Sequence, residues 1–284
     1  MTAAVPSRGM RTPAGVRELV VGAGVVIALA QFVGSPVAWI VAGLLMLAIV
    51  LGALQVFGEA SATTRARGVP IESLIEPAVV AFGAVGTLRL VPVGLLLVPA
   101  IGVALWLLDR SLGLEARLVA ATTPATAADR TAVLAITVVA GLAAFAGIAA
   151  LIPGGLPESG TALGAEPPAS SVSPAVVLAL AAADGLVAFV LAYRVAALRS
   201  SNIRDVGWAA STGAAVVAIA AAVLRTLDIP WLLGPALLVL VFFLWEAMHG
   251  GAPTRRRDPR RLWEAALLVV IGVLVVAWSV GSRV

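Results

Sequence analysis

The strongest constraint on this chain is its division into long apolar blocks separated by short connectors that carry arginine. Blocks of about 20 residues have the length that an α-helix needs to cross a bilayer. Apolar residues make up 61% of the sequence and charged residues 12%. Soluble domains carry about 45–50% and roughly 25% respectively. This composition cannot build a water-facing surface, so it predicts a protein embedded in lipid.

Nine blocks are long enough to be membrane spans. They cover residues 17–34, 36–57, 74–90, 92–108, 131–152, 174–194, 208–225, 229–248 and 263–281. Each should be a helix, because backbone groups in a bilayer must bond within their own segment. Barrel strands are about 9–11 residues long and alternate in polarity, which these blocks do not. The predicted fold class is all-α, a polytopic transmembrane helix bundle forming one integral membrane domain over residues 1–284.

Two long blocks leave the span count open. Each could be one span plus a fragment, but charged residues and prolines interrupt them at positions 89–92 and 225–230. Such interruptions favour tight turns at a membrane surface. We therefore expect a hairpin of two short helices within each block, at residues 73–108 and 208–248.

The arginines predict the orientation of the chain. With the N-terminus in the cytoplasm, 16 of 19 arginines lie in inside segments, and only Arg89, Arg225 and Arg283 lie outside. Positively charged residues are retained in cytoplasmic loops. The prediction is a bacterial-type cytoplasmic membrane protein with its N-terminus inside and its C-terminus outside. A cleavable leader ending near Ala30 is the alternative to a retained first span.

The first four spans and the next four resemble two copies of one unit. Leu88-Arg89 and Pro99-Ala100 recur as Leu224-Arg225 and Pro235-Ala236 at one constant offset. The predicted pseudo-repeats cover residues 17–110 and 130–248, followed by an extra helix at 263–281. Copies with an even number of spans share one orientation, and a ligand site would lie between them near mid-membrane. The alternative is chance matching in a sequence rich in Ala, Val and Leu.

Asp184 is the most informative single residue. It lies near the middle of the sixth predicted span, where an aspartate costs roughly 2.5–3.5 kcal/mol on insertion scales. Such residues face the bundle interior or a water-filled cavity, so Asp184 is a candidate for proton coupling or for binding a polar substrate. The alternative is a structural hydrogen bond between helices, with Ser211, Thr212 or Thr137 as partners at similar depth.

Three further candidates accompany Asp184. Arg89 and Arg225, with Asp228, lie at the predicted outer surface, where they would form an anion-binding entrance, pair with each other or extend to lipid head groups. Glu76 begins the third span, where a carboxylate is favoured by the helix dipole, and a site-lining role is the second interpretation. Pro99 and Pro235 can kink their helices and free backbone carbonyls.

Several classes of chemistry are excluded or disfavoured. The chain has no cysteine, no lysine and one histidine, which excludes thiolate metal sites, Schiff bases and bis-histidine haem. Glu246 and His249 form only half of a di-iron motif, so no metal or other cofactor is expected. Nucleotide-binding and hydrolase motifs are absent. We therefore expect no enzymatic activity, although the sequence leaves this open.

Two functions remain. The first is a small permease or channel-like protein with a site between its two four-helix halves. The second is a non-catalytic accessory or scaffold subunit of a membrane complex. The expected partners are the lipid bilayer and either a partner membrane protein or a second copy of the chain. Nucleic acid is not expected, because the arginines flank spans rather than forming one basic face.

Overall fold

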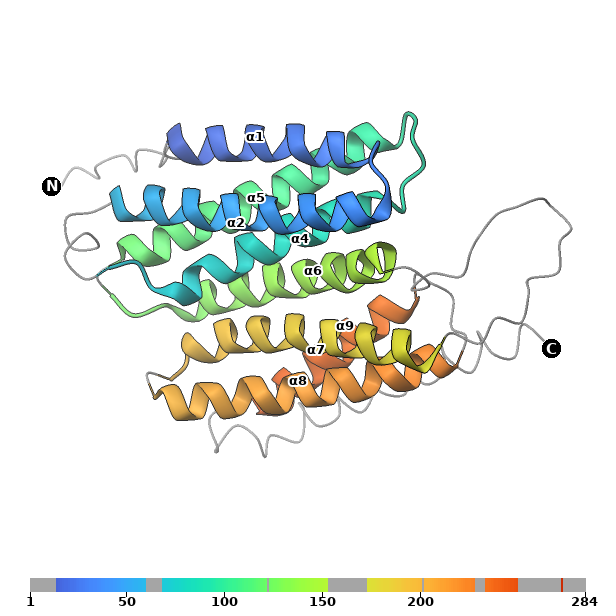
Figure 1. Cartoon of the computed structure of the whole chain (residues 1–284). Helices are drawn as coiled ribbons and strands as arrows, with labels where there is room; N and C mark the ends of the chain where they lie inside the picture. The colour runs from blue at the N-terminus through green and yellow to red at the C-terminus, as the bar shows by residue number, and fades with distance from the viewer. Residues whose placement is uncertain are drawn as a thin grey trace, which may run out of the picture.

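The computed structural model describes residues 14–59, 68–121, 123–152, 173–200, 202–227 and 233–249, together with Gly272. Within these residues every regular element is a helix. The elements are α1 (Ala14–Ala30), α2 (Ser35–Glu59), η1 (Ile71–Leu74), α4 (Ile75–Leu88), α5 (Leu97–Ala120), α6 (Ala127–Leu151), α7 (Pro174–Ala197), α8 (Ile203–Thr226) and α9 (Leu233–His249). The helices lie side by side as rods, and α4 and α6 occupy the middle of the bundle (Figure 1).

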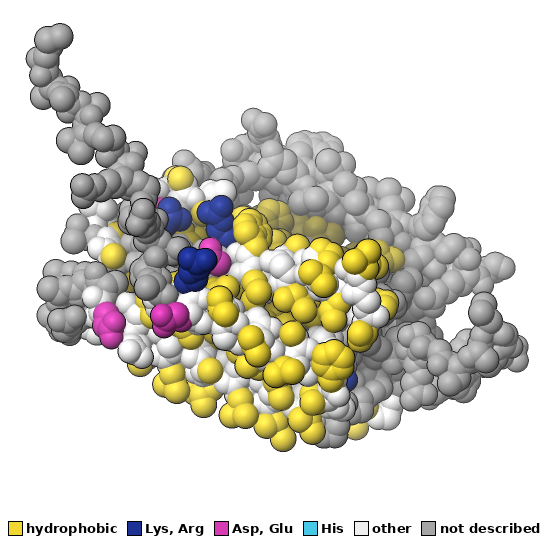
Figure 2. Space-filling model, turned by 90° about the horizontal axis from the view of Figure 1, so that it is seen from above, with side chains coloured by type: hydrophobic (Ala, Val, Ile, Leu, Met, Phe, Trp, Pro, Cys, Tyr) yellow, Lys and Arg dark blue, Asp and Glu magenta, His cyan; other side chains and the backbone are white. Residues whose placement is uncertain are grey.

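Six helical segments are long and apolar enough to cross a membrane. They are Val37–Glu59, Ile71–Leu88, Leu97–Ala120, Ala127–Leu151, Pro174–Ala197 and Ile203–Thr226, while Leu233–His249 is a shorter apolar helix. Large apolar side chains face outward along them, Leu178 being 72% exposed. Figure 2 shows hydrophobic side chains covering most of the described part of one face, with charged side chains toward one end. This is the architecture of a helical membrane protein, as the composition predicted.

Eight of the nine predicted spans overlap helices, namely α1, α2 and α4 to α9, and six of these helices, counting α4 together with η1, contain a segment long and apolar enough to cross a membrane. The ninth predicted span, residues 263–281, lies outside the described residues, except for Gly272. Gly272 is helical and buried, and a Cβ placed on it would lie 3.0 Å from Leu240 of α9. The main correction concerns the fourth span, which was predicted to end at residue 108. Helix α5 continues to Ala120, so residues 109–120 are helical rather than a connector.

Local sequence signals fix the helix ends. Thr126 and Asp129 form a reciprocal capping box at the start of α6, and Asn202 accepts a hydrogen bond from Arg204 N at the start of α8. Both predicted hairpins contain a helix break, between α4 and α5 and between α8 and α9. Pro99 is the third residue of α5, where a missing N–H costs nothing. Pro99 therefore does not kink α5, which corrects that prediction, whereas residues 228–232, directly before α9 and Pro235, lie outside the described residues.

The centre of the bundle is a close contact between α4 and α6. A Cβ on Gly83 would lie 2.8 Å from the backbone nitrogen of Ala144, and a Cβ on Gly86 would overlap the backbone of Gly147. Glycine is required on both helices because their backbones touch. Thr87 strengthens the contact by donating a hydrogen bond to Ala143 O at 2.5 Å.

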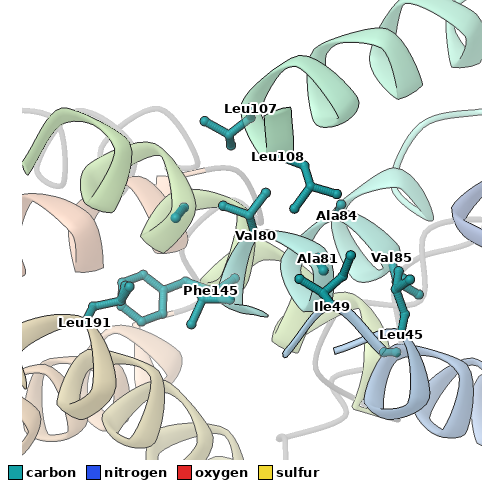
Figure 3. Packing of buried hydrophobic residues seen from close by; sticks show 14 of the residues in the cluster. Leu45, Ile49, Val80, Ala81, Ala84, Val85, Leu107, Leu108, Phe145 and Leu191 are labelled. Carbon is teal, nitrogen blue, oxygen red and sulfur yellow. The ribbon is translucent and has the colours of Figure 1, made fainter. Parts of the chain in front are cut away.

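Apolar side chains on either side of this contact complete the core. Phe145 of α6 lies beside Leu191 of α7, and Ile49 of α2 lies near Ala81 of α4 (Figure 3). Phe145, Ile49 and Leu191 are almost completely inaccessible to solvent. The polar groups described below are consequently enclosed by closely packed hydrocarbon.

Candidate functional site

Asp184 is buried, as predicted, and its partner is Arg225. Asp184 is completely inaccessible on α7, and its Oδ2 lies 3.5 Å from an Nη atom of Arg225 on α8. Close approach of the two helices at Gly185 brings these side chains together, since a Cβ there would lie 3.0 Å from Ala218. Both members of the pair belong to the second half of the chain.

The hydroxyl groups proposed as partners of Asp184 have other contacts. Thr137 donates its hydroxyl hydrogen to Glu76, and Thr212 donates to carbonyl oxygens of its own helix. Ser211 is exposed on α8. The expectation of a bond from one of these hydroxyls to Asp184 was therefore wrong, because an arginine at the end of α8 reaches back toward the aspartate instead.

Arg89 stabilises the end of the first helix. Its guanidinium donates hydrogen bonds to Ala30 O at 3.2 Å and to Val33 O at 2.7 Å. A cation at the carboxyl end of a helix satisfies free carbonyls and is favoured by the helix dipole. Arg89 and Arg225 therefore have separate partners, and their helices α4 and α8 do not pack together. The structure does not bring them together as a shared entrance.

Glu76 lies on the inside of the bundle. Its side chain is completely inaccessible, and Oε1 accepts the hydrogen bond from Thr137 of α6. Among the described residues, Oε2 has no hydrogen-bond partner. The start of α4 thus places one carboxyl group against α6, with one oxygen satisfied and the other unsatisfied.

A second buried carboxylate, that of Glu115, lies near Glu76 and forms a bidentate ion pair with Arg194. Arg194 Nε lies 2.7 Å from Glu115 Oε1, and Arg194 Nη2 lies 2.6 Å from Glu115 Oε2. Both side chains are buried, at 0% and 3% exposure of the residue. Paired hydrogen bonds of this geometry are the strongest that arginine makes with a carboxylate. The sequence analysis missed this pair because it placed position 115 in a connector.

These residues form one cluster between the two halves of the chain, hereafter the inter-half cluster: Glu76, Glu115, Thr137 and Arg194. The first two come from α4 and α5, and the other two from α6 and α7. Glu76 and Glu115 are close enough for their charges to interact, and Glu72 of η1 also acts on Glu115. Glu72 is only partly buried, so it links the cluster to the end of the bundle.

The Glu246-x-x-His249 pattern forms structural contacts. Glu246 Oε2 lies 2.6 Å from an Nη atom of Arg199, and the His249 ring stacks on Trp245 with 4.8 Å between ring centroids. No group of three or more acidic, histidine or cysteine side chains suited to a metal occurs in the part of the chain that the structure describes. The pair therefore helps join α7 to α9.

Comparison with protein-family models, curated proteins and solved structures finds no match for this chain.

Proposed function

We propose that the protein is a small permease that couples solute movement to a proton carried by Glu76. The single observation that carries the proposal is the inter-half cluster, in which ionisable groups from both halves meet inside an apolar bundle. Buried ionisable residues within membrane segments commonly mark ion or substrate pathways. Among the four residues named at the outset, Glu76 is the one that contacts the other half of the chain.

The charges in the inter-half cluster favour a proton that Glu76 can bind and release. Both oxygens of Glu115 are bonded to Arg194, so these two charges neutralise each other. Among the described residues Glu76 accepts a hydrogen bond only from the Thr137 hydroxyl, which cannot compensate a carboxylate in hydrocarbon. A proton on Glu76 removes the uncompensated charge, and its release to a solvated pathway restores it. Glu72, at the edge of the cluster, gives that pathway a partly exposed carboxyl group.

The helix contacts support the four-plus-four repeat that this function requires. In the first half α1 packs on α2 and α5, and α4 packs on α2 and α5. In the second half α6 packs on α7 and α9, and α8 packs on α7 and α9. Each of these four contacts has a counterpart in the other half, whereas the smaller contacts of α1 with α4 and of α2 with α5 have no counterpart of similar extent. The halves meet chiefly through α4 and α6, near which the inter-half cluster lies.

The cluster lies nearer one end of the bundle than the mid-membrane site predicted from the repeat. Glu76 is the second residue of α4, whereas Glu115 and Arg194 lie within the last two turns of α5 and α7. With the arginine distribution, this end faces the cytoplasm of a bacterial-type cell and the other end faces outward. Asp184 and Arg225 would then form a second polar layer on the outer side of the cluster.

The test is transport in proteoliposomes that contain a pH-sensitive dye. A pH gradient is imposed, and pools of amines, amino acids, sugars or carboxylates are added outside. We expect at least one pool to drive proton movement with the native protein and not with Glu76→Gln. The control is Glu59→Gln, because Glu59 is exposed at the end of α2 and accepts a hydrogen bond from nearby Gln55. If correctly folded protein moves no solute and no proton from any pool, the proposal is wrong.

A second candidate is an accessory subunit that packs against another membrane protein or a second copy of the chain. The observation that favours it is the outward face of α8, where Trp208 is 74% exposed and Gly207 has open space beside it. Small and aromatic residues together allow close helix packing in membranes. Light scattering in detergent and crosslinking from α8 in native membranes would detect such a complex. A monomer without crosslinks would remove this candidate.

A further inference from the structure

A small pocket opens at the end of the bundle where α6 begins and α7 ends. It has a volume of about 120 Å³ and is lined by Arg130, Thr131, Leu134, Val195, Leu198 and Arg199. It lies apart from the inter-half cluster, none of whose residues line it. No part of the proposed transport mechanism uses this pocket.

The pocket presents two guanidinium groups, those of Arg130 and Arg199. Arg199 is neutralised by Glu246 at 2.6 Å. No carboxylate of the described residues lies within 4.0 Å of Arg130 in an ion pair, and the Asp129 side chain is held by Thr126. Glu246 and Asp129 are thus the acidic groups that adjoin the site. The formal charges of these four groups balance, but Arg130 has no ion pair among the described residues, so its guanidinium can donate to an anion, and Arg199 adds donors.

Apart from Thr131, whose hydroxyl donates to Ala127 O of its own helix, the rest of the pocket is apolar. Leu134 lies one turn beyond Arg130 on α6, and Val195 and Leu198 form the opposite wall at the end of α7. The arginines therefore occupy the mouth, and the hydrocarbon surface continues along the helices. A lipid with a phosphate group and an acyl chain fits this arrangement of a charged mouth and an apolar wall. Arginine binds phosphate oxygens by paired hydrogen bonds, and the acyl chain would contact the apolar wall. A free inorganic phosphate would use only the mouth.

We propose that this pocket binds the phosphate group of an anionic phospholipid, with one acyl chain along Leu134, Val195 and Leu198. The choline group of phosphatidylcholine would place a further cation beside Arg130 and Arg199, so the site favours phosphatidylglycerol. The start of α6 and the end of α7 are the ends of two candidate membrane spans, Ala127–Leu151 and Pro174–Ala197, where lipid head groups would meet the bundle. Basic pockets between helices are a recurrent way of holding such head groups.

The experiment is native mass spectrometry of the full chain released from detergent after incubation with phosphatidylglycerol or phosphatidylcholine. We expect the native protein to retain phosphatidylglycerol in preference. Arg130→Gln should weaken its apparent affinity about tenfold, the effect of losing one charge-assisted contact. The matched control is Arg204→Gln, which removes an exposed arginine near the start of α8 and should leave retention unchanged. Equal losses in both variants would mean a general charge effect and would overturn the proposal.

A second variant separates a lipid from free phosphate. Leu198→Trp fills the apolar wall without removing a charge, so it should abolish phosphatidylglycerol retention. Thermal melting with inorganic phosphate alone is then compared between the native protein and Arg130→Gln. Stabilisation by millimolar inorganic phosphate, with phosphatidylglycerol retention unaffected by Leu198→Trp, would show a free-anion site and contradict a lipid site. Equal retention of the two lipids by the native protein would also contradict it.

Discussion

Arg194 holds Glu115 by two hydrogen bonds of 2.7 and 2.6 Å, and this bidentate pair joins α7 in one half of the chain to α5 in the other. Neither side chain has appreciable access to solvent. A buried ion pair is weak evidence for stability, because desolvation offsets most of the attraction. The same desolvation makes the loss of a single partner strongly destabilising, because the remaining charge stays buried. Removing one partner should therefore lower the free energy of unfolding more than removing both.

The first prediction concerns this asymmetry. Glu115→Gln should lower the free energy of unfolding by roughly 3–5 kcal/mol, because it leaves the Arg194 cation buried without a counter-charge. The double variant Glu115→Leu with Arg194→Met should recover most of this loss, since it removes both charges. Unfolding by SDS in mixed micelles measures both values. If the double variant is as unstable as the single variant, the ion pair itself stabilises the fold, and the instability of the single variant does not come from an uncompensated charge.

The second prediction concerns the contact between α4 and α6. Gly86→Ala should destabilise the protein by about 1–3 kcal/mol, because the new methyl group would overlap the backbone of Gly147 and two helices would have to separate. Gly43→Ala on α2 is the matched control, since a Cβ there has nothing within 4 Å. It should be neutral or stabilising by up to about 1 kcal/mol through helix propensity. Equal effects at the two glycines would show that the helices can move apart at little cost.

Much of this architecture was predictable from the sequence, because span length and apolarity are imposed by the bilayer itself. The helix breaks near positions 89 and 225 were predicted from charge and proline, and both occur. Burial of Asp184 was also predicted and is confirmed. Its partner was not, because the reach of an arginine from the end of α8 depends on how closely α7 and α8 approach. The proposed roles of Asp184, Arg89, Arg225 and Glu76 stay predictions.

The Glu115–Arg194 pair was missed for a different reason. Charged residues after an apolar block were treated as loop residues, although α5 continues through them. One signal was present in the sequence: Leu108, Ser111, Leu112 and Glu115 recur at helical spacing, and all four are buried. From that periodicity the helix could have been predicted to continue past residue 108, with Glu115 on its buried face. The partner residue would still have required the packing of α5 near α7.

The third prediction concerns Asp184 and Arg225. Arg225→Gln should destabilise the native protein more than it destabilises an Asp184→Asn background, because in the native protein it strands a buried aspartate. The difference should be on the order of 1 kcal/mol, given the N–O separation of 3.5 Å. The same SDS titration of the four proteins completes the double-mutant cycle. Additive effects would mean that the two groups do not interact. Under the proposed permease function, Asp184→Asn should also change the transport rate in proteoliposomes.

The fourth prediction concerns orientation in the membrane, and the absence of cysteine makes it direct to test. Gly94 and Thr123 are exposed and lie just beyond opposite ends of α5. In intact cells a membrane-impermeant maleimide should label Gly94→Cys and should label Thr123→Cys only after the membrane is permeabilised, because arginine-rich connectors stay inside. Nine spans further predict that Val284→Cys is labelled from outside. Labelling of Thr123→Cys in intact cells would reverse the orientation, whereas protection of Val284→Cys alone would remove the ninth span and retain the rest.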